Sequence, residues 1–342
     1  MKKKQLNRRQ LWRIQKMQEA YTHRAAKKES LIEETLKGTD LGEEQKGIVI
    51  SNFGQQLDIE ALEGEHQGKI FRCFQRSNIE SLVTGDYVIW QEGEPVGVVI
   101  AVLPRENFLE RPSALGELRP VAANIDQIVI VIAPLPEPFN NLIDRYLVAA
   151  EQYRIAPFLL LNKSDLINSE NSEVLESLLA IYRDIGYPVL TVSSKTGEGM
   201  EAFKAHLENK TSVFVGQSGV GKSALVNKLL PGTNTQIGEL SEARDKGRHT
   251  TTAARLYHFQ DGGDLIDSPG IREFHLEHID LDTLQQGFIE FQPYLNECKF
   301  RDCMHEQEPG CSLKQAVEDN KIHSKRMESY RLICKTLSNS KY

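Results

Sequence analysis

One short segment constrains the fold of this chain more than any other: the loop Gly216–Ser223, which has the pattern Gly-x-x-x-x-Gly-Lys-Ser. In loops of this kind several backbone N–H groups converge on phosphate oxygens, and side chains at the glycine positions would block that approach. The preceding segment 211–215 is typical of a buried strand, and the following segment 224–230 is typical of a helix. A strand, this loop and a helix in sequence predict an α/β domain that binds a nucleoside triphosphate.

Every residue of the loop is a predicted nucleotide contact. Lys222 is expected to reach the β- and γ-phosphates, and the Ser223 hydroxyl is expected to bind Mg²⁺. The alternative, a glycine-rich turn without a ligand, is disfavoured by the strand and helix on either side. The backbone of the other loop residues is expected to surround the phosphates: Gly216, Gln217, Ser218, Gly219, Val220 and Gly221.

Two further loops predict which base is bound. The first has the Asn-Lys-x-Asp pattern and follows the apolar run 156–161, which is typical of a central parallel strand. Its carboxylate can accept hydrogen bonds from N1–H and the 2-amino group of guanine, and adenine has neither donor. The second loop follows the short strand 189–192 and is expected to direct a backbone N–H at guanine O6. The predicted base-reading residues are Asn162, Lys163, Ser164 and Asp165 in the first loop, and Ser193, Ser194 and Lys195 in the second.

Downstream of the phosphate loop lie residues expected to sense the γ-phosphate. Asp267 follows the short strand 263–266 and is expected to hold Mg²⁺ through water, and the Gly270 N–H is expected at the γ-phosphate. The intervening polar stretch contains Thr250, Thr251 and Thr252, one of which should complete the Mg²⁺ shell. We favour Thr251, although the pattern leaves all three open.

The guanine-reading loops precede the phosphate loop, so the nucleotide-binding domain has been opened and its ends rejoined elsewhere. This order of motifs resembles the circularly permuted GTPases and, over residues 40–335, the YjeQ/RsgA family of ribosome-associated GTPases. The resemblance implies GTP or GDP as the bound nucleotide. It also implies a role in maturation of the small (30S) ribosomal subunit, with 16S rRNA as the expected RNA partner.

The sequence offers His249 as the catalytic residue. Ile271 stands where many signalling GTPases carry a glutamine that orients the attacking water, and an aliphatic side chain cannot do this. Another group must therefore supply that function, and an imidazole in the threonine loop is the best internal candidate. The resemblance supports the assignment, since family members carry a histidine in the same stretch. A solvated loop histidine is the alternative.

Five cysteines, an odd number, favour a reducing cytoplasm over a disulfide framework. Four soft or borderline ligands with the spacing Cys-x₄-Cys-x-His-x₅-Cys predict a closed tetrahedral Zn²⁺ site, with iron as an open alternative. The resemblance to the family's zinc-binding domain supports one zinc per chain. The predicted ligands are Cys298, Cys303, His305 and Cys311.

The chain is predicted to be multidomain. Residues 1–28 contain ten Lys or Arg against one acidic residue, so segment 1–40 is expected to be a basic RNA-binding arm or a solubilising tail. Residues 41–108 contain short β-rich runs at 47–50, 70–74, 87–90 and 96–100, typical of a small barrel like the oligonucleotide-binding (OB) fold. The span 106–125, with its prolines, is expected to be an extended connector. Residues 109–275 form the predicted GTPase domain, and 276–342 a helical zinc-binding domain.

The motifs together predict a GTP hydrolase that binds the small ribosomal subunit in its GTP state and leaves in its GDP state. An RNA-binding protein with a structural guanine site and negligible turnover is the alternative. An ATP-dependent kinase or helicase is disfavoured because no adenine site is found. The chain contains no run of eighteen apolar residues, so no membrane span is expected. The net charge of −7 does not by itself indicate nucleic-acid binding. A monomer is expected because no extended self-association surface is evident.

Overall fold

The computed structural model describes residues 41–54, 56–76, 78–112, 117–231, 254–267 and 279–339. The chain divides between Pro104 and Arg105 into two compact units. The finer domain boundaries expected at 40, 108 and 275 stay predictions. None of the helices in the described ranges is both long enough and apolar enough to cross a membrane.

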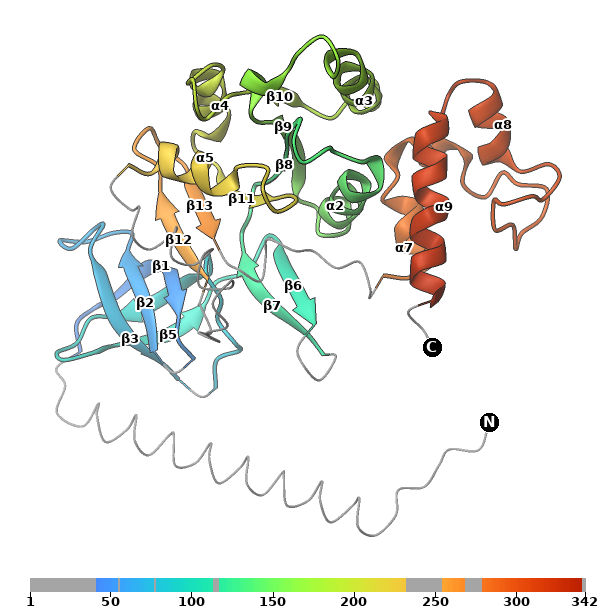
Figure 1. Ribbon diagram of the computed structural model, residues 1–342. Helices are drawn as coiled ribbons and strands as arrows, with labels where there is room; N and C mark the ends of the chain where they lie inside the picture. The colour runs from blue at the N-terminus through green and yellow to red at the C-terminus, as the bar shows by residue number, and fades with distance from the viewer. Residues whose placement is uncertain are drawn as a thin grey trace, which may run out of the picture. The chain divides into compact units, whose positions relative to one another are not determined.

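The first unit is a closed β-barrel (Figure 1). Its strands are β1 (Glu44–Asn52), β2 (Gln56–Ala61), β3 (Ile70–Gln75), β4 (Tyr87–Gln91) and β5 (Gly97–Val102). They follow the order β1-β2-β3-β5-β4, and β4 pairs again with β1, so that no strand edge of the barrel stays open. Its interior is filled by fully buried apolar side chains, among them Val49, Leu57 and Trp90. This confirms the predicted OB-like barrel.

Strand β2 was not among the β-rich runs predicted from the sequence. Its sequence alternates apolar and polar residues, and only Leu57, Ile59 and Ala61 point into the core. The intervening Asp58 and Glu60 hide the strand from any search for continuous apolar runs. Such alternation is expected wherever one face of a strand is buried and the other faces outward.

The second unit contains a doubly wound sheet. Its strands are β8 (Gln127–Ile132), β9 (Ala156–Leu161), β10 (Val189–Thr191), β11 (Thr211–Val215), β12 (Arg255–His258) and β13 (Asp264–Asp267). These six strands follow the order β10-β9-β8-β11-β13-β12; the β12–β13 pair is antiparallel, and the other pairs among them are parallel. The accompanying helices are α2 (Asn140–Gln152), α3 (Ser172–Ile185), α4 (Met200–Leu207) and α5 (Lys222–Leu229), with a short 3₁₀ turn η1 (Ser164–Leu166).

This strand order makes the permutation visible. The phosphate-loop strand β11 lies between β8 and β13, although the chain reaches it only after β8, β9 and β10. The buried strand β8 carries six buried residues, as its continuous apolar sequence predicts for a central parallel strand. The α/β domain and its rearranged order are therefore confirmed.

The prediction of an extended connector over 106–125 was wrong in part. Strands β6 (Phe108–Pro112) and β7 (Leu118–Ala123) form a two-stranded antiparallel hairpin within this span. Pro120 pairs opposite Glu110, next to an irregularity in the register between Leu109 and Glu110. Each strand of a two-stranded ribbon keeps an open edge, so a proline without an N–H group is tolerated there.

The remaining elements form a helical module. They are α7 (Leu281–Gln286), the 3₁₀ helix η2 (Ile289–Tyr294), α8 (Ser312–Glu318) and α9 (Ser324–Asn339). Their shared apolar core also contains Val148 and Ala149 of α2. Helix α9 therefore packs against α2, as Figure 1 shows, and the module and the nucleotide-binding sheet belong to one compact unit.

Candidate guanine-nucleotide site and cysteine–histidine cluster

The predicted nucleotide-binding loops gather at one edge of the parallel sheet. The Asn162 loop follows β9, the Ser193 loop follows β10, and the phosphate loop follows β11. Asp267 ends β13, which pairs in parallel with β11, so its carboxylate lies at the same edge. Ligands of doubly wound folds bind outside the carboxyl ends of the strands, and these residues occupy that place.

The phosphate loop needs its glycines for steric reasons. Gly216 and Gly221 have φ angles of 138° and 96°, a region that disfavours side chains. A Cβ at Gly216 would lie 2.2 Å from the Val131 carbonyl oxygen, and one at Gly221 would lie 2.4 Å from Nδ2 of Asn162. The loop therefore packs too closely on its neighbours for any larger residue at these two positions.

Lys222 and Ser223, the last two residues of the loop, lie in the first turn of α5. The Lys222 ammonium donates hydrogen bonds to the carbonyls of Gly216 and Gln217, at 2.6 and 2.9 Å. These contacts hold a positive charge over the loop. Together with the helix N-terminus, this arrangement favours an anion at the loop.

Asn162 joins two of the loops. Its side chain is fully buried, donates from Nδ2 to the Val220 carbonyl at 3.0 Å, and accepts at Oδ1 from the Ser194 N–H at 3.1 Å. The neighbouring Lys163, in a left-handed backbone conformation, donates from Nζ to the carbonyls of Gly219 and Leu135, at 2.6 and 2.9 Å. The first two residues of the Asn-Lys-x-Asp loop therefore fix the phosphate loop against the base-reading loops.

Asp165 is held ready as a charged acceptor. The Ser193 hydroxyl donates to Oδ1 of Asp165 at 2.6 Å. The Ser193 Oγ also accepts a hydrogen bond from the Thr196 N–H, and this directs the hydroxyl hydrogen to the carboxylate. The Lys195 ammonium lies 3.6 Å from Oδ2. The hydrogen bond from Ser193 lowers the pKa of the Asp165 carboxyl below its ordinary value. An ionised, oriented carboxylate at this position suits a base that offers two N–H donors.

Sequence reasoning missed one partner in this region. Glu198 accepts a hydrogen bond at Oε2 from the Ser164 hydroxyl, at 2.9 Å, and so adds a further link between the two base-reading loops. A glutamate in a polar turn carries no local signal of such a contact. Several predicted residues lie outside the described ranges, and their roles stay predictions: His249, Thr250, Thr251, Thr252, Gly270 and Ile271.

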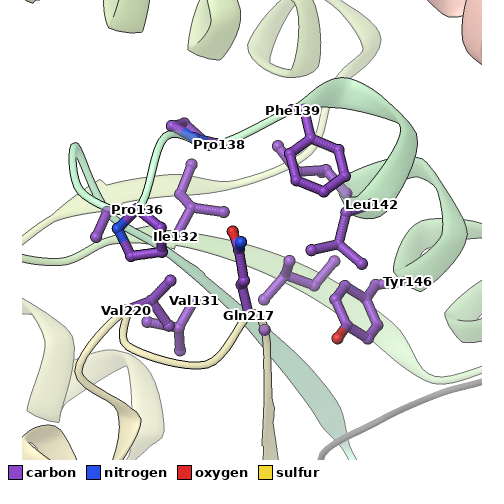
Figure 2. A pocket seen from close by; sticks show the side chains of 13 residues that line it. Val131, Ile132, Pro136, Pro138, Phe139, Leu142, Tyr146, Gln217 and Val220 are labelled. Carbon is purple, nitrogen blue, oxygen red and sulfur yellow. The ribbon is translucent and has the colours of Figure 1, made fainter.

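A small apolar recess adjoins the phosphate loop. Figure 2 shows Phe139, Leu142 and Tyr146 facing Gln217 and Val220 across it. Phe139 directly precedes α2, and Leu142 and Tyr146 belong to it. Gln217 and Val220 belong to the phosphate loop. Helix α2 therefore forms one wall of the space beneath the nucleotide-binding loop.

The four predicted metal ligands converge in the helical module. Their ligand atoms all lie within 4.8 Å of one another. Nδ1 of His305 is 3.6 Å from Sγ of Cys298, 3.6 Å from that of Cys303 and 3.4 Å from that of Cys311. A tetrahedral Zn²⁺ with ordinary bond lengths separates its ligand atoms by about 3.6–3.8 Å. The residues thus fit a four-coordinate metal.

Two residues outside the ligand set support this cluster. Ser312 places its hydroxyl oxygen 3.1 Å from Sγ of Cys298 and directs its N–H at the same sulfur. Arg331 of α9 donates to the His305 carbonyl at 2.9 and 3.2 Å. Sequence reasoning missed both residues because neither is itself a ligand. Such contacts orient metal ligands, and the burial of His305 and Cys311 indicates a structural site.

Comparison with known proteins agrees with this geometry. The model of the RsgA GTPase family matches residues 102–277. The chain is 58% identical over 343 residues to the small ribosomal subunit biogenesis GTPase RsgA of Ectopseudomonas mendocina, with all of both chains covered. The protein of the same name from Azotobacter vinelandii is 56% identical, again over the whole of both chains.

Solved structures give the same picture. YjeQ from Thermotoga maritima superposes with a TM-score of 0.72 and 33% identity, covering 86% of this chain and 99% of that one. YloQ, described as a circularly permuted GTPase, superposes with a TM-score of 0.69 and 29% identity, covering 87% and 96%. Both likenesses extend well beyond the sheet that carries the nucleotide site.

Proposed function

This chain belongs to the RsgA GTPase family, and from that premise we propose that it is a GTP hydrolase that binds the small (30S) ribosomal subunit and assists its late maturation. The observation that carries the proposal is the joined site around Asn162, where one side chain bonds both the phosphate loop and the Ser194 loop beside a charged Asp165. The names of the full-length relatives support the ribosomal part of the proposal.

Nucleotide binding follows from these contacts. Guanine N1–H and its 2-amino group donate to the Asp165 carboxylate, and the phosphates lie on the N–H groups of the loop Gly216–Ser223 beside the Lys222 ammonium. The Ser223 hydroxyl, one threonine of the group 250–252 and, through water, Asp267 would hold Mg²⁺. When bound, this ion neutralises charge that develops on the phosphates.

Hydrolysis is assigned to His249, which would orient the attacking water because Ile271 cannot. A group that must be positioned by a partner gives slow turnover alone and faster turnover on the ribosomal subunit. The GTP state then favours subunit binding, and hydrolysis followed by γ-phosphate loss favours release.

RNA contact is proposed for the barrel, the basic arm 1–40 and the helical module, with 16S rRNA as the partner. Exposed aromatic rings on the barrel, Phe53 at 53% and Tyr87 at 39% exposure, suit base stacking. The Arg72 guanidinium lies 4.9 Å from the Phe53 ring but also pairs with Asp58 at 2.8 Å, so it adds little net charge. The cluster would hold one Zn²⁺ per chain. We place the protein in the cytoplasm as a monomer.

Phosphate release tests the proposal directly. GTP turnover is measured with purified protein alone, with 30S subunits, and with 50S subunits as the control. We expect stimulation of about tenfold or more by 30S only, lost in His249→Ala. Unchanged turnover with 30S would instead favour an RNA-binding protein with a structural nucleotide. Stimulation that survives His249→Ala would overturn the assignment of that residue alone.

A further inference from the structure

Helix α9 connects the cysteine–histidine cluster to the nucleotide-binding domain through two arginines. Arg326 reaches into the nucleotide-binding domain, and Arg331, five residues along the same helix, reaches the His305 carbonyl beside the metal ligands. Neither arginine is needed for guanine recognition or as a ligand. Their positions indicate that the helix links the two sites.

Arg326 is fully buried, with none of its side chain exposed. It donates from Nη1 to the Asp144 carboxylate of α2, and from Nε and Nη2 to both oxygens of Glu290 in η2, at 2.6 and 3.0 Å. Burial alone would lower the pKa of Arg326, but the Asp144 and Glu290 carboxylates raise it, so the guanidinium stays charged. A buried charge with this many partners fixes α9 and η2 against α2.

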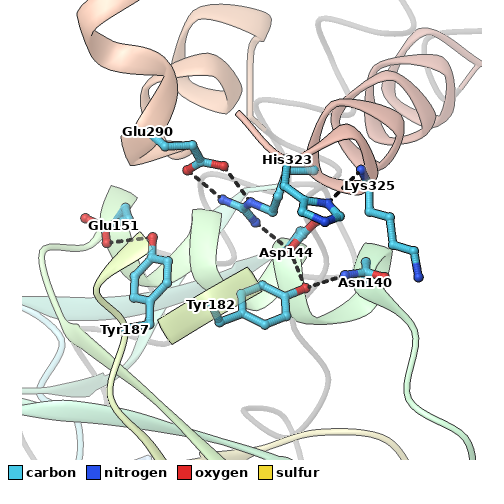
Figure 3. A network of polar contacts seen from close by, with 9 residues as sticks. Asn140, Asp144, Glu151, Tyr182, Tyr187, Glu290, His323 and Lys325 are labelled. Carbon is cyan, nitrogen blue, oxygen red and sulfur yellow. Dashed lines mark hydrogen bonds and ion pairs between the residues drawn. The ribbon is translucent and has the colours of Figure 1, made fainter. Parts of the chain in front are cut away.

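Asp144, the partner of Arg326 on α2, is also held by a hydrogen bond to α3. Asp144 is fully buried and accepts a hydrogen bond from the Tyr182 hydroxyl of α3 at 2.8 Å, and Asn140 donates to that hydroxyl at 3.2 Å (Figure 3). Burial raises the pKa of the Asp144 carboxyl, and the guanidinium of Arg326 opposes that shift. The first two turns of α2 are therefore positioned by α3 and by the helical module together.

The same turns of α2 border the nucleotide site. Leu142 and Tyr146 line the apolar recess whose other wall is the phosphate loop, at Gln217 and Val220. The segment before α2 supplies the Leu135 carbonyl that accepts from Lys163 of the guanine-reading loop. A displacement of α2 would consequently change the surroundings of both the phosphate loop and the Asn162–Asp165 loop.

At the opposite end, α9 packs on the cluster. The Tyr330 ring lies edge-on to His305 at 6.3 Å and edge-on to Phe288 at 5.6 Å, and the Arg326 guanidinium lies 4.3 Å from the Phe288 ring. The cluster, α9, the Arg326 network and α2 thus form a series of packed contacts. From α2 the series continues to the phosphate loop through the recess that both line, and through Lys163, which bonds the carbonyls of Leu135 and Gly219.

We propose that metal binding at the cluster and guanine-nucleotide binding are energetically coupled through α9 and α2, with Arg326 as the positioning residue that carries the coupling. This rests on the two sites of the proposed function. A metal that orders the cluster holds α9 in place, and α9 holds α2 against the phosphate loop. Coupling between binding sites is reciprocal, so each ligand tightens the other by the same factor.

The full-length protein provides the test. The GDP dissociation constant is measured by calorimetry with Zn²⁺ bound and after removal of Zn²⁺ by a chelator. The Zn²⁺ affinity is measured by competition with and without saturating GDP. We expect zinc to raise the GDP affinity, and GDP to raise the zinc affinity, by the same factor of about five or more. If the zinc-loaded protein binds GDP but the two affinity ratios are near one, the coupling is overturned. If the zinc-loaded protein does not bind GDP at all, the proposed function is overturned instead.

A variant with the whole charge network replaced isolates Arg326. The triple substitution Asp144→Leu, Glu290→Gln and Arg326→Met leaves no unpaired buried charge, so folding should be retained. Both ligands should still bind, but with ratios near one. Arg183→Met, which removes an exposed pair with Glu176, is the matched control and should keep the full ratios. Full coupling in the triple variant would refute the role of Arg326.

Discussion

The guanine-reading loops and the cysteine–histidine cluster are both assembled from a few polar side chains, but they are held together differently. Asn162 and Asp165 are held in place by hydrogen bonds to other residues of the protein. Three thiols and an imidazole lie within 4.8 Å of one another, and this donor set suits a metal that would hold them together. We therefore expect the guanine-reading loops to be organised before their ligand binds, and the cluster to be organised by its metal.

The largest expected effect follows from this difference at the cluster. Cys311→Ser removes a buried ligand, so the helical module should lose its metal and unfold, at a cost of several kcal/mol. Zinc content and a thermal melt followed by limited proteolysis of segment 279–339 measure this. Cys334→Ser, in the same module but outside the ligand set, is the control and should retain one zinc. A zinc-free Cys311→Ser protein with an unchanged melt would remove the contrast between the sites.

The next effect is on base selection. Asp165→Asn replaces an acceptor of two N–H groups by a side chain with a donor, and we expect GDP to bind about 10²–10³-fold more weakly. Xanthine carries a carbonyl where guanine has its 2-amino group, so xanthosine diphosphate should now bind better than GDP. Calorimetry with both nucleotides measures this. The melting temperature should change little, because the loop is held by Asn162; a large fall would show that Asp165 is structural.

A smaller loss is expected at the residue that joins the loops. Asn162→Ala leaves the Val220 carbonyl and the Ser194 N–H without their partner, at a cost of about 1–3 kcal/mol, or roughly ten- to hundredfold in GDP affinity. Ser164→Ala, which loses only an exposed hydrogen bond to Glu198, should stay within about twofold. Equal losses in the two variants would contradict the idea that a buried junction organises the site in advance.

The smallest effect concerns pH. The Ser193 hydroxyl keeps the pKa of Asp165 below its ordinary value, so the carboxylate stays charged, and GDP stays bound, as the pH falls toward that value. In Ser193→Ala the pKa returns upward, and the affinity should begin to fall at a higher pH, with a loss below about tenfold at pH 7.5. GDP titrations between pH 8 and about 4.5 measure this. Ser194→Ala is the control, since only its backbone N–H is used; identical pH profiles for both variants would contradict the assignment.

The same contrast explains what could be predicted from the sequence. Phosphate, guanine and metal sites require particular residues at fixed local spacing, so the motifs Gly216–Ser223, Asn162–Asp165 and the four cluster residues could be recognised in the sequence. The structure brings the two loops to one edge of the sheet and the four cluster residues within 4.8 Å of one another, and their roles as ligands stay predictions. The parallel strands were found because a strand buried on both faces is continuously apolar.

Contacts between distant segments leave no such pattern. Arg326 and Asp144 are 182 residues apart, and nothing near either one indicates the other. The hairpin β6–β7 was hidden by Pro112 and Pro120, which usually argue against strands, and β2 was hidden by its outward carboxylates. The fold of each unit was thus predictable, but not the network that fixes the helical module to the nucleotide-binding domain.

Calorimetric comparison of GDP and ADP binding to the intact wild-type protein tests most directly whether loops in permuted order form a preorganised guanine site. We expect GDP to bind at least about 10³-fold more tightly than ADP, because adenine has neither the N1–H nor the 2-amino group and the desolvated Asp165 carboxylate would be left without their hydrogen bonds. Equal affinities for the two nucleotides would contradict it.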